Sequence, residues 1–366
     1  MSRKNETAPE TFEPSNERYS RQERFRPIGN DGQKQLRQKH VLIVGAGALG
    51  SASAECMVRA GIGKLTIVDR DYVEWSNLQR QQLYTEKDVR ERLPKVIAAK
   101  RHLEAINAEV QIEARVWDVR GRELTELVEG VDLILDACDN FHTRFIINDV
   151  AQKYQIPWVY AACVGSYGIS CTIVPGETPC LSCMMDLIPG NGESCDIDGI
   201  IAPAVQMVVS HQTAEALKIL TGNMEALHRK LVSFDLWSNQ FTRINIHSMK
   251  KEHCSSCSCE AVYPFLQNSK DTENEKAAAL CGRDTVHIRP NVAMSISIEE
   301  LAASLDKQEI FQIETMNSFL LSANVNALRI VLFNDGRALV HGTANVVHAR
   351  QVYKRLLGYM EIKLLS

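Results

Sequence analysis

A glycine-rich turn between two apolar runs constrains the fold of this chain most strongly. The run His40–Val44 leads into Gly45-Ala46-Gly47-Ala48-Leu49-Gly50, and the helix-compatible segment Ser51–Ala60 and the apolar run Lys64–Asp69 follow. Strand, turn, helix and strand in this order form the βαβ unit of a parallel sheet. Glycines let a backbone turn tightly and approach phosphate, and a helix start offers free N–H donors. We therefore expect a nucleotide cradle at Gly45, Gly47 and Gly50, with Asp69 available to ribose hydroxyl groups.

The following segments continue the alternation of strands and helices. Lys95–Asn107 has apolar residues at helical spacing, whereas Val131–Ala137 and Trp158–Cys163 are typical of buried strands. This order predicts an α/β fold with a doubly wound, Rossmann-like and mostly parallel sheet. From Ile169 the pattern becomes β-rich, and a long apolar helix is expected from about Pro203 to Leu220.

The end of the chain has a pattern of its own. Leu328–Phe333 and Arg337–His341 flank an Asn-Asp-Gly turn and predict a β-hairpin, and Val346–Leu357 predicts a helix. A polar stretch, Gln267–Lys276, precedes this part and indicates a linker. We expect a disordered tail (1–16), a nucleotide domain with a zinc-tethered β-rich part (17–259), a linker (260–278) and a small α+β module (279–366).

Composition excludes several classes of protein. The 366 residues are 45% hydrophobic and 23% charged with a formal net charge of −4, so no basic field indicates a nucleic-acid partner. The N-terminal stretch lacks the pattern of a signal peptide, and no run reaches the roughly 20 apolar residues that span a membrane. We expect a cytoplasmic protein whose eleven cysteines are mostly reduced.

Charged side chains follow the predicted strand ends. Arg80 and Lys95 lie after the second strand, and Asp139 follows the strand Val131–Ala137. Ligands bind at the carboxyl ends of such strands, so these groups are expected to converge. The glycine turn fits NAD as well as ATP, but two cations and a carboxylate for Mg²⁺ suit a triphosphate better. Taken singly, Arg80, Lys95 and Asp139 are each equally typical of a solvated charge on the protein surface.

Two CxxC pairs, Cys180/Cys183 and Cys254/Cys257, supply four thiolates. Four thiolates bind Zn²⁺ tetrahedrally and leave no open position for water, which is typical of a structural site. The alternative is four unrelated buried thiols. Cys259 extends the second pair to CxxCxC, and we choose Cys257 because it completes the pair.

Several segments together are much more specific than the glycine turn. They are Arg18-Tyr19-Ser20-Arg21-Gln22, Gly45 to Gly50, Asp69-x-Asp71, Ser76-Asn77-Leu78-Gln79-Arg80-Gln81, Pro94-Lys95 and Cys138-Asp139-Asn140. In these segments the chain resembles the ThiF/MoeB/HesA family, bacterial relatives of ubiquitin-activating E1 enzymes, over about Arg18 to Cys257. The resemblance implies that ATP lies on the glycine turn and that members carry Cys₄ zinc at the two CxxC pairs.

The resemblance also implies roles for individual residues. The residue matching Asp69 holds the ribose, and those matching Arg80 and Lys95 neutralise phosphate. The residue matching Asp139 serves the Mg²⁺ ion and the adenylylation step. The residue matching Arg21 reaches the ATP site of the other subunit in a homodimer. Further nucleotide contacts are expected from the matching segments at Asp71, Asn77 and Gln81.

Cys195 lies in a polar, glycine-bounded loop. Such a loop keeps a thiol accessible, although its acidic neighbours oppose thiolate formation, so the residues alone favour an incidental cysteine. In ThiF-like relatives the cysteine at this position takes part in sulfur transfer or covalent linkage to the carrier, whereas in MoeB-like relatives it is dispensable for adenylylation. We include Cys195 among the catalytic candidates.

The resemblance predicts an adenylyltransferase that activates the C-terminal glycine of a ubiquitin-like sulfur carrier of the ThiS or MoaD type, for thiamine-thiazole or molybdopterin synthesis. The segment after about Tyr263 has no recognisable rhodanese loop, so the sulfur donor is expected to be separate, such as a cysteine desulfurase or a rhodanese. Two alternatives stay open: an NAD-dependent oxidoreductase, and a non-catalytic zinc-stabilised scaffold that binds a ubiquitin-like protein.

Overall fold

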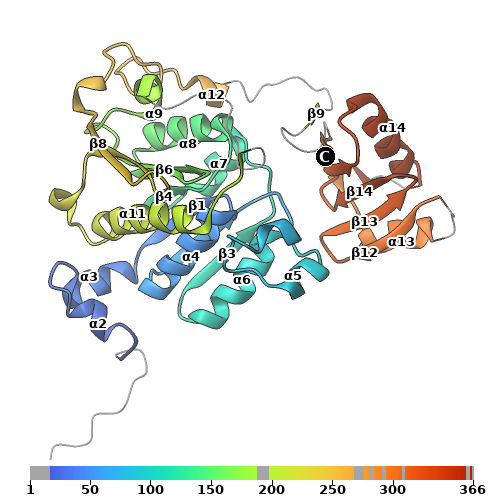
Figure 1. Cartoon of the computed structure of the whole chain (residues 1–366), viewed down its shortest axis with the longest axis horizontal. Coiled ribbons are helices and arrows are strands. Elements are labelled where there is room, and N and C mark those ends of the chain that lie inside the picture. Colours follow the sequence, from blue (N-terminus) through green and yellow to red (C-terminus); the bar gives the residue numbers. More distant parts are fainter. Residues whose placement is uncertain are drawn as a thin grey trace, which may run out of the picture.

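The protein forms two β-sheets with helices packed around them (Figure 1). The structure, a computed structural model, describes residues 17–187, 198–267, 276–279, 284–290, 294–306, 310–359 and 363–364. The larger sheet has the strand order β3-β2-β1-β4-β5-β6-β7-β8. Its strands are β1 (His40–Val44), β2 (Lys64–Val68), β3 (Gln111–Arg115), β4 (Leu133–Asp136), β5 (Trp158–Val164), β6 (Tyr167–Ile173), β7 (Lys230–Asp235) and β8 (Gln240–Asn245).

The strands β3, β2, β1, β4 and β5 run parallel, and β6, β7 and β8 continue the sheet in antiparallel pairs. The predicted doubly wound, mostly parallel sheet is therefore confirmed. The strand order reverses between β1 and β4, and a crevice at such a switch point is where open α/β sheets bind ligands. The glycine turn after β1 lies at this point.

Helices cover both faces of the larger sheet. Residues of β1 alternate between them, because Val41 and Ile43 belong to one apolar cluster and Leu42 and Val44 to the other. The first cluster includes α3 (Gly29–Leu36), α4 (Ala48–Ala60), α6 (Lys95–Ile106) and part of α11 (Ala202–Leu220). The second includes α7 (Gly121–Leu127) and α8 (Phe141–Tyr154). Shorter helices are α2 (Ser20–Glu23), α5 (Glu86–Arg90), α9 (Leu181–Met184) and α12 (Pro264–Gln267).

Two glycines of the turn are required by close backbone approach. Gly45 has φ +103°, and a Cβ there would lie 2.4 Å from the carbonyl oxygen of Ala137, just after β4. A Cβ at Gly50 would lie 1.9 Å from the carbonyl oxygen of Gly45. Side chains at these positions would push the turn away from β4, so both glycines set the shape of the cradle.

The smaller sheet is antiparallel, in the order β12-β13-β14-β15-β10-β9. Its strands are β9 (Lys276–Ala279), β10 (Thr285–Arg289), β12 (Gln312–Met316), β13 (Leu320–Val325), β14 (Leu328–Phe333) and β15 (Ala338–His341). The helices α13 (Ile298–Leu305) and α14 (Val346–Leu357) share an apolar cluster with one face of the sheet. The short strands β11 (Met294–Ser295) and β16 (Lys363–Leu364) pair separately. The predicted hairpin is β14–β15 and the predicted helix is α14.

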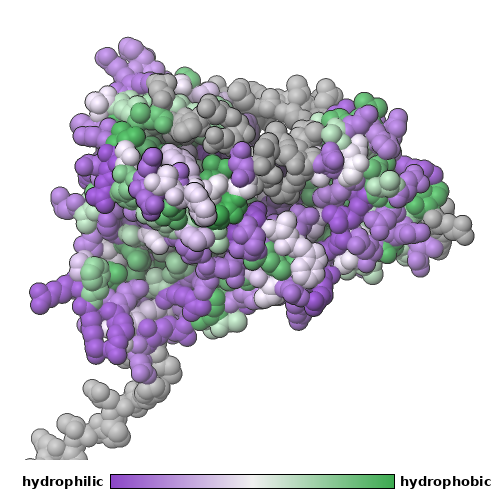
Figure 2. Space-filling view, in the orientation of Figure 1, coloured by the Kyte–Doolittle hydropathy of each residue, from purple (hydrophilic) through white to green (hydrophobic). Residues whose placement is uncertain are grey.

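The other face of the smaller sheet contacts the nucleotide domain. Leu320, Val331, Phe333 and Leu339 form an apolar cluster with Tyr72, which follows β2. On the face shown in Figure 2, hydrophilic residues cover most of the described surface and hydrophobic residues form scattered groups. No helix within the described ranges is long and apolar enough to cross a membrane.

The predicted linker, residues 260–278, is ordered at both ends. Helix α12 packs on α8 because Phe265 stacks on Phe145, with ring centroids 4.6 Å apart. Strand β9 pairs with β10 although its alanines favour a helix, since β10 offers an open edge for pairing. The rest of the linker, the predicted N-terminal tail and Cys195 lie outside the described residues.

Replacing Gly45 with alanine tests the cradle geometry, and Gly130→Ala is the matched control. Gly130 also has positive φ, but a Cβ there would have no atom within 4 Å. We expect G130A to lower the free energy of unfolding by about 1 kcal/mol from backbone strain alone, and G45A by at least about 3 kcal/mol because of the added clash. Urea denaturation measures both. Equal losses would contradict the close approach.

Candidate nucleotide site and metal centre

The carboxylate of Asp69 connects the glycine turn with the loop after β2. One oxygen accepts the N–H of Ala46 at 2.6 Å, and the other accepts the N–H of Asp71 at 2.7 Å. Burial raises the pKa of Asp69, while Lys95 and these two hydrogen bonds lower it. Each oxygen keeps a second lone pair. Asp69 therefore fixes the turn and can still accept a hydrogen bond from a ligand.

The glycine turn offers polar groups around an open space. The first-turn N–H groups of α4 have no partner within the helix. A Cβ on Gly47 would meet its nearest neighbour, the side-chain nitrogen of Gln81, only at 3.9 Å. Gln81 is 4% exposed, and its side-chain oxygen has no hydrogen-bond partner. Such an orphaned buried oxygen is typical of a ligand site, and it fits a bound nucleotide.

Lys95, the first residue of α6, is buried beside the acidic loop. Its ammonium lies 3.3 Å from a carboxylate oxygen of Asp71, and its backbone N–H donates to the Asp71 carbonyl at 2.9 Å. Burial alone lowers the pKa of Lys95, but nearby carboxylates, led by that of Asp71, raise it. Asp69 and Asp139 are also among these carboxylates, so the structure places three acidic side chains near Lys95.

The two carboxylates after β4 lie in different surroundings. Asp136 is fully buried and forms a 3.1 Å ion pair with Arg144 of α8, a residue that sequence reasoning missed. Arg144 also donates to the Cys138 carbonyl at 2.6 Å. Asp139 is exposed at the edge of the site. Asp136 therefore fixes the backbone of this turn, and Asp139 remains available to a cation. Burial raises the pKa of the Cys138 thiol well above its usual value, as befits a packing residue.

The segment from Trp75 to Gln81 flanks the turn. Asn77 is buried and accepts the N–H of Glu74 at 3.0 Å, which shapes the short helix there. Arg80 is half-buried and donates to the Ser76 carbonyl at 2.8 Å. Tyr84, which sequence reasoning missed because a lone tyrosine carries no signal, donates to the Ala46 carbonyl at 2.6 Å. Tyr84 thus fixes the backbone of the glycine turn from the residues that follow this segment.

Arg21 lies at the opposite end of α4. The neighbouring Gln22 donates to the Ala60 carbonyl at 2.9 Å, and Tyr19 packs against Gly61. The helix between them and the glycine turn has 13 residues and is about 20 Å long. Arg21 is exposed and belongs to α2, which Figure 1 shows beyond α4, so it lies far from the nucleotide site of its own chain.

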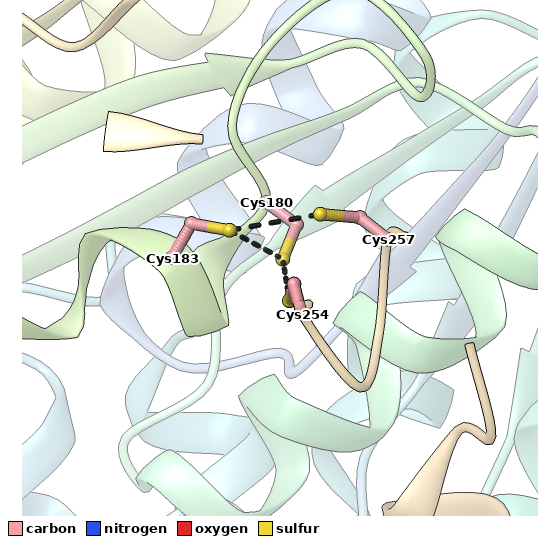
Figure 3. A group of neighbouring side chains, drawn as sticks. All are labelled: Cys180, Cys183, Cys254 and Cys257. Carbon is pink, nitrogen blue, oxygen red and sulfur yellow. Dashed lines mark hydrogen bonds between the residues drawn. The ribbon is translucent and has the colours of Figure 1, made fainter. Parts of the chain in front are cut away.

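The four cysteines of the two CxxC pairs meet in space. Figure 3 shows that their sulfur atoms point toward one another, from the start of α9 and from the loop after β8. The sulfur atoms of Cys180 and Cys183 are 3.8 Å apart, and those of Cys180 and Cys254, and of Cys183 and Cys257, are 3.6 Å apart. Cys259 is exposed and lies outside the group.

These separations fit a tetrahedral metal. Bonds of about 2.3 Å from Zn²⁺ place sulfur ligands about 3.8 Å apart. Neighbouring groups also orient the sulfurs, because the N–H of Lys251 donates to the Cys183 sulfur at 3.4 Å and Ser182 bonds Ser256 at 3.2 Å. Hydrogen bonding among the thiols raises the pKa of Cys180 and lowers that of Cys183. The cluster is compatible with a closed structural zinc site.

The sequence profile of the ThiF family matches residues 19–259, which is most of the chain. The chain belongs to the ThiF family. It is 49% identical over 341 residues to the sulfur carrier protein ThiS adenylyltransferase of Bacillus subtilis, covering 93% of this chain and 99% of that protein. It is 34% identical over 241 residues to the molybdopterin-synthase adenylyltransferase of Escherichia coli, covering 66% and 95%.

Solved structures agree on the fold. The crystal structure of E. coli MccB with MccA-N7isoASN matches with a TM-score of 0.59 and 23% identity, covering 66% of this chain and 75% of that one. E. coli MccB with ATP matches with a TM-score of 0.57 at 23% identity, covering 66% and 74%. At this identity the likeness concerns the fold alone. The ThiF match ends at residue 259, so the C-terminal sheet lies beyond it.

Replacing a single cysteine separates metal ligands from the bystander. We expect C254S to lose most of the bound metal, because the three remaining sulfurs no longer close the site. C259S should keep about one zinc per chain, because all four ligands remain. Elemental analysis of the purified variants measures the content, and thermal unfolding should show a lower Tm only for C254S. Equal zinc in both variants would contradict the ligand set.

Proposed function

We propose that this ThiF-family protein adenylylates the C-terminal glycine of a ubiquitin-like sulfur carrier of the ThiS type. The observation that carries the proposal is the grouping of the glycine turn, Lys95 and Asp139 at the switch point of the sheet. The choice of carrier rests on the Bacillus subtilis relative, which matches 93% of this chain. The molybdopterin relative matches only 66%.

Adenylylation makes modest chemical demands on the enzyme. A carboxylate oxygen of the carrier attacks the α-phosphorus of ATP, and the bond to the bridging oxygen breaks to release pyrophosphate. The attacking carboxylate is already ionised, so the site needs no general base. It must align the reactants and disperse the negative charge that builds on phosphate.

The described residues suit these tasks. The N–H groups at the start of α4 and the side chain of Gln81 bind phosphate and ribose next to Gly47. Lys95 keeps its charge despite burial and neutralises phosphate, and Arg80 assists from the flanking segment. Asp139, exposed at the edge of the site, would hold Mg²⁺, which when bound would supply further positive charge to the triphosphate.

The second half of the reaction brings in sulfur. A persulfide of a separate donor, such as a cysteine desulfurase or a rhodanese, attacks the acyl carbon and displaces AMP. A thiol then cleaves the resulting acyl disulfide and leaves the carrier with a thiocarboxylate. Cys195 remains a candidate for a covalent intermediate in this step. The reaction takes place in the cytoplasm, where thiols stay reduced.

The enzyme acts as a homodimer with shared sites. Arg21 lies at the far end of α4, about 20 Å from its own glycine turn along a helix of 13 residues. A two-fold partner can bring its own copy of this arginine to the phosphate groups. An arginine contributed across an interface stabilises charge on a transferring phosphate group.

Pyrophosphate exchange into ATP tests the proposed function. With purified carriers compared in parallel, we expect a ThiS-type carrier to stimulate exchange at least about tenfold more than a MoaD-type carrier. A carrier truncated by its terminal glycine is the control and should give none, because it lacks the reacting carboxylate in the right place. Exchange without any carrier, or a preference for the MoaD type, would contradict the proposal.

Mixing two inactive variants tests the shared site. We expect Arg21→Ala and Asp139→Asn each to abolish exchange alone, since each removes one component from both sites of the dimer. In a refolded equimolar mixture, half of the dimers are mixed and each has one intact site, so activity should return to about a quarter of wild type. Differently tagged variants verify that mixed dimers form. If they form and the exchange activity does not return, Arg21 does not act in the partner's site.

A further inference from the structure

The C-terminal sheet contacts three segments at the edge of the nucleotide site, two of which carry residues of that site. We call residues 69–74, 90–95 and 115–118 the nucleotide loops. The first contains Asp69 and Asp71, the second ends at Lys95, and the third follows β3 at the same edge of the larger sheet. The first two are also joined to each other, since Val73 donates to the Leu93 carbonyl at 2.9 Å and Tyr72 bridges Pro94.

The first contact is apolar. Tyr72, immediately after Asp71, is 4% exposed and packs against Leu320, Val331 and Phe333 of the smaller sheet. Its hydroxyl lies 3.1 Å from the ring nitrogen of His341 and receives a 3.3 Å hydrogen bond from Arg329. The C-terminal module therefore contacts both the ring and the hydroxyl of Tyr72, the residue that follows Asp69 and Asp71.

Arg337 of the smaller sheet ties two loops together. Its guanidinium donates to the Arg70 carbonyl at 3.2 Å and to the Val116 carbonyl at 3.3 Å. The side chain lies over the ring of Phe333 at 4.7 Å and is 6% exposed. Because a guanidinium is planar and rigid, this pair of bonds fixes the distance between the first and third nucleotide loops.

The loop before Lys95 is held by a separate set of bonds. Arg92 has φ +45°, an unfavourable conformation for a side-chain-bearing residue. Its guanidinium donates to the Ser322 hydroxyl at 2.7 Å and pairs with Glu314 at 2.6 Å. The side-chain amide of Asn317 donates to the carbonyls of Glu91 and Arg92 at 3.1 and 3.3 Å.

A buried charge cluster completes the contact. Asp118 of the third loop pairs with Arg70 at 3.0 Å and with Arg289 of β10. His287 of β10 is buried beside this cluster, and its burial, with Arg70 nearby, lowers its pKa to about 3. The side chains that face the nucleotide loops thus come from β10, β12, β13, β14 and β15 and from the turns beside them.

We propose that the C-terminal module is a positioning element of the nucleotide site, with Asn317, Ser322 and Arg337 as its positioning residues. Asn317 and Arg337 donate to backbone carbonyls, and Ser322 accepts from the Arg92 guanidinium; together they hold the loops that place Asp69, Asp71 and Lys95 around ATP. The inference rests on the proposed function, because it assumes that ATP binds at the glycine turn. The module makes the site ready for ATP before the carrier binds.

Three variants of the full chain test the proposal. Asn317→Asp keeps the oxygen that accepts the N–H groups of Phe319 and Leu320, but it replaces the amide donor with an acceptor facing two carbonyls. Ser322→Ala removes one bond to Arg92 without changing charge, and Arg337→Met removes both carbonyl contacts. We expect the Kd of ATP, measured by calorimetry without carrier, and the KM for ATP to rise at least fivefold in N317D and R337M and about twofold in S322A. The kcat and the KM for the carrier should stay within about twofold.

Matched controls come from the same module. Asn345→Asp is the control for Asn317→Asp: it makes the same change at the cap of α14, where only the retained oxygen takes part in hydrogen bonds. Arg355→Met is the control for Arg337→Met, and it lies on the exposed end of the same helix. Both controls should bind ATP like wild type, and Arg337→Lys should recover part of the affinity. Unchanged ATP affinity in N317D and R337M, with only a lower Tm, would overturn this inference alone. Failure of the wild type to bind ATP would instead overturn the proposed function.

Discussion

The half-buried carboxylate of Asp69 makes the contacts on which the nucleotide site depends. It accepts one N–H from the glycine turn and one from its own loop, so the turn after β1 and the loop after β2 keep a fixed relation. Burial raises the pKa of Asp69, and Lys95 beside the same loop lessens that rise. A neutral or longer side chain at position 69 would release the cradle, the acidic loop and the lysine together.

Much of the fold could be predicted from local patterns. Apolar runs that end in glycine or in acidic residues marked β1, β2 and β4, and the Asn-Asp-Gly turn between β14 and β15 marked the hairpin. Strand β3 was missed because Gln111–Arg115 is mostly polar and half-exposed at the edge of the sheet. The extended strand β9 was missed because its alanines favour a helix, and only pairing with β10 makes it a strand.

The site could be predicted where residue types carry the chemistry, and not where geometry does. Spacing alone brought out the four cysteines, which meet across two distant segments. Arg144 and Tyr84 were not foreseeable, since each acts through a tertiary contact, with Asp136 and with the Ala46 carbonyl respectively. The contact of the C-terminal sheet with the nucleotide loops could not be predicted either. Polar residues at alternate positions of a strand indicate an outward face, but not the segment that packs against it.

The nucleotide domain thus obtains its rigidity from two sources outside the glycine turn. The four cysteines tie α9 to the loop after β8 on one side, and the smaller sheet covers the nucleotide loops on the other (Figure 1). Between them the parallel sheet presents its carboxyl edge to ATP. This arrangement explains how a site without a general base can still align two reactants, since alignment is the main task of the enzyme.

Transfer of oxygen from carrier to nucleotide tests most directly whether the carrier carboxylate attacks the α-phosphorus. A carrier labelled with ¹⁸O in its terminal carboxylate is incubated with the enzyme and ATP, and hydroxylamine then releases the nucleotide. Attack by the carrier carboxylate gives AMP that contains one ¹⁸O atom, which mass spectrometry detects. Unlabelled AMP, or release of ADP with labelled phosphate, would contradict it.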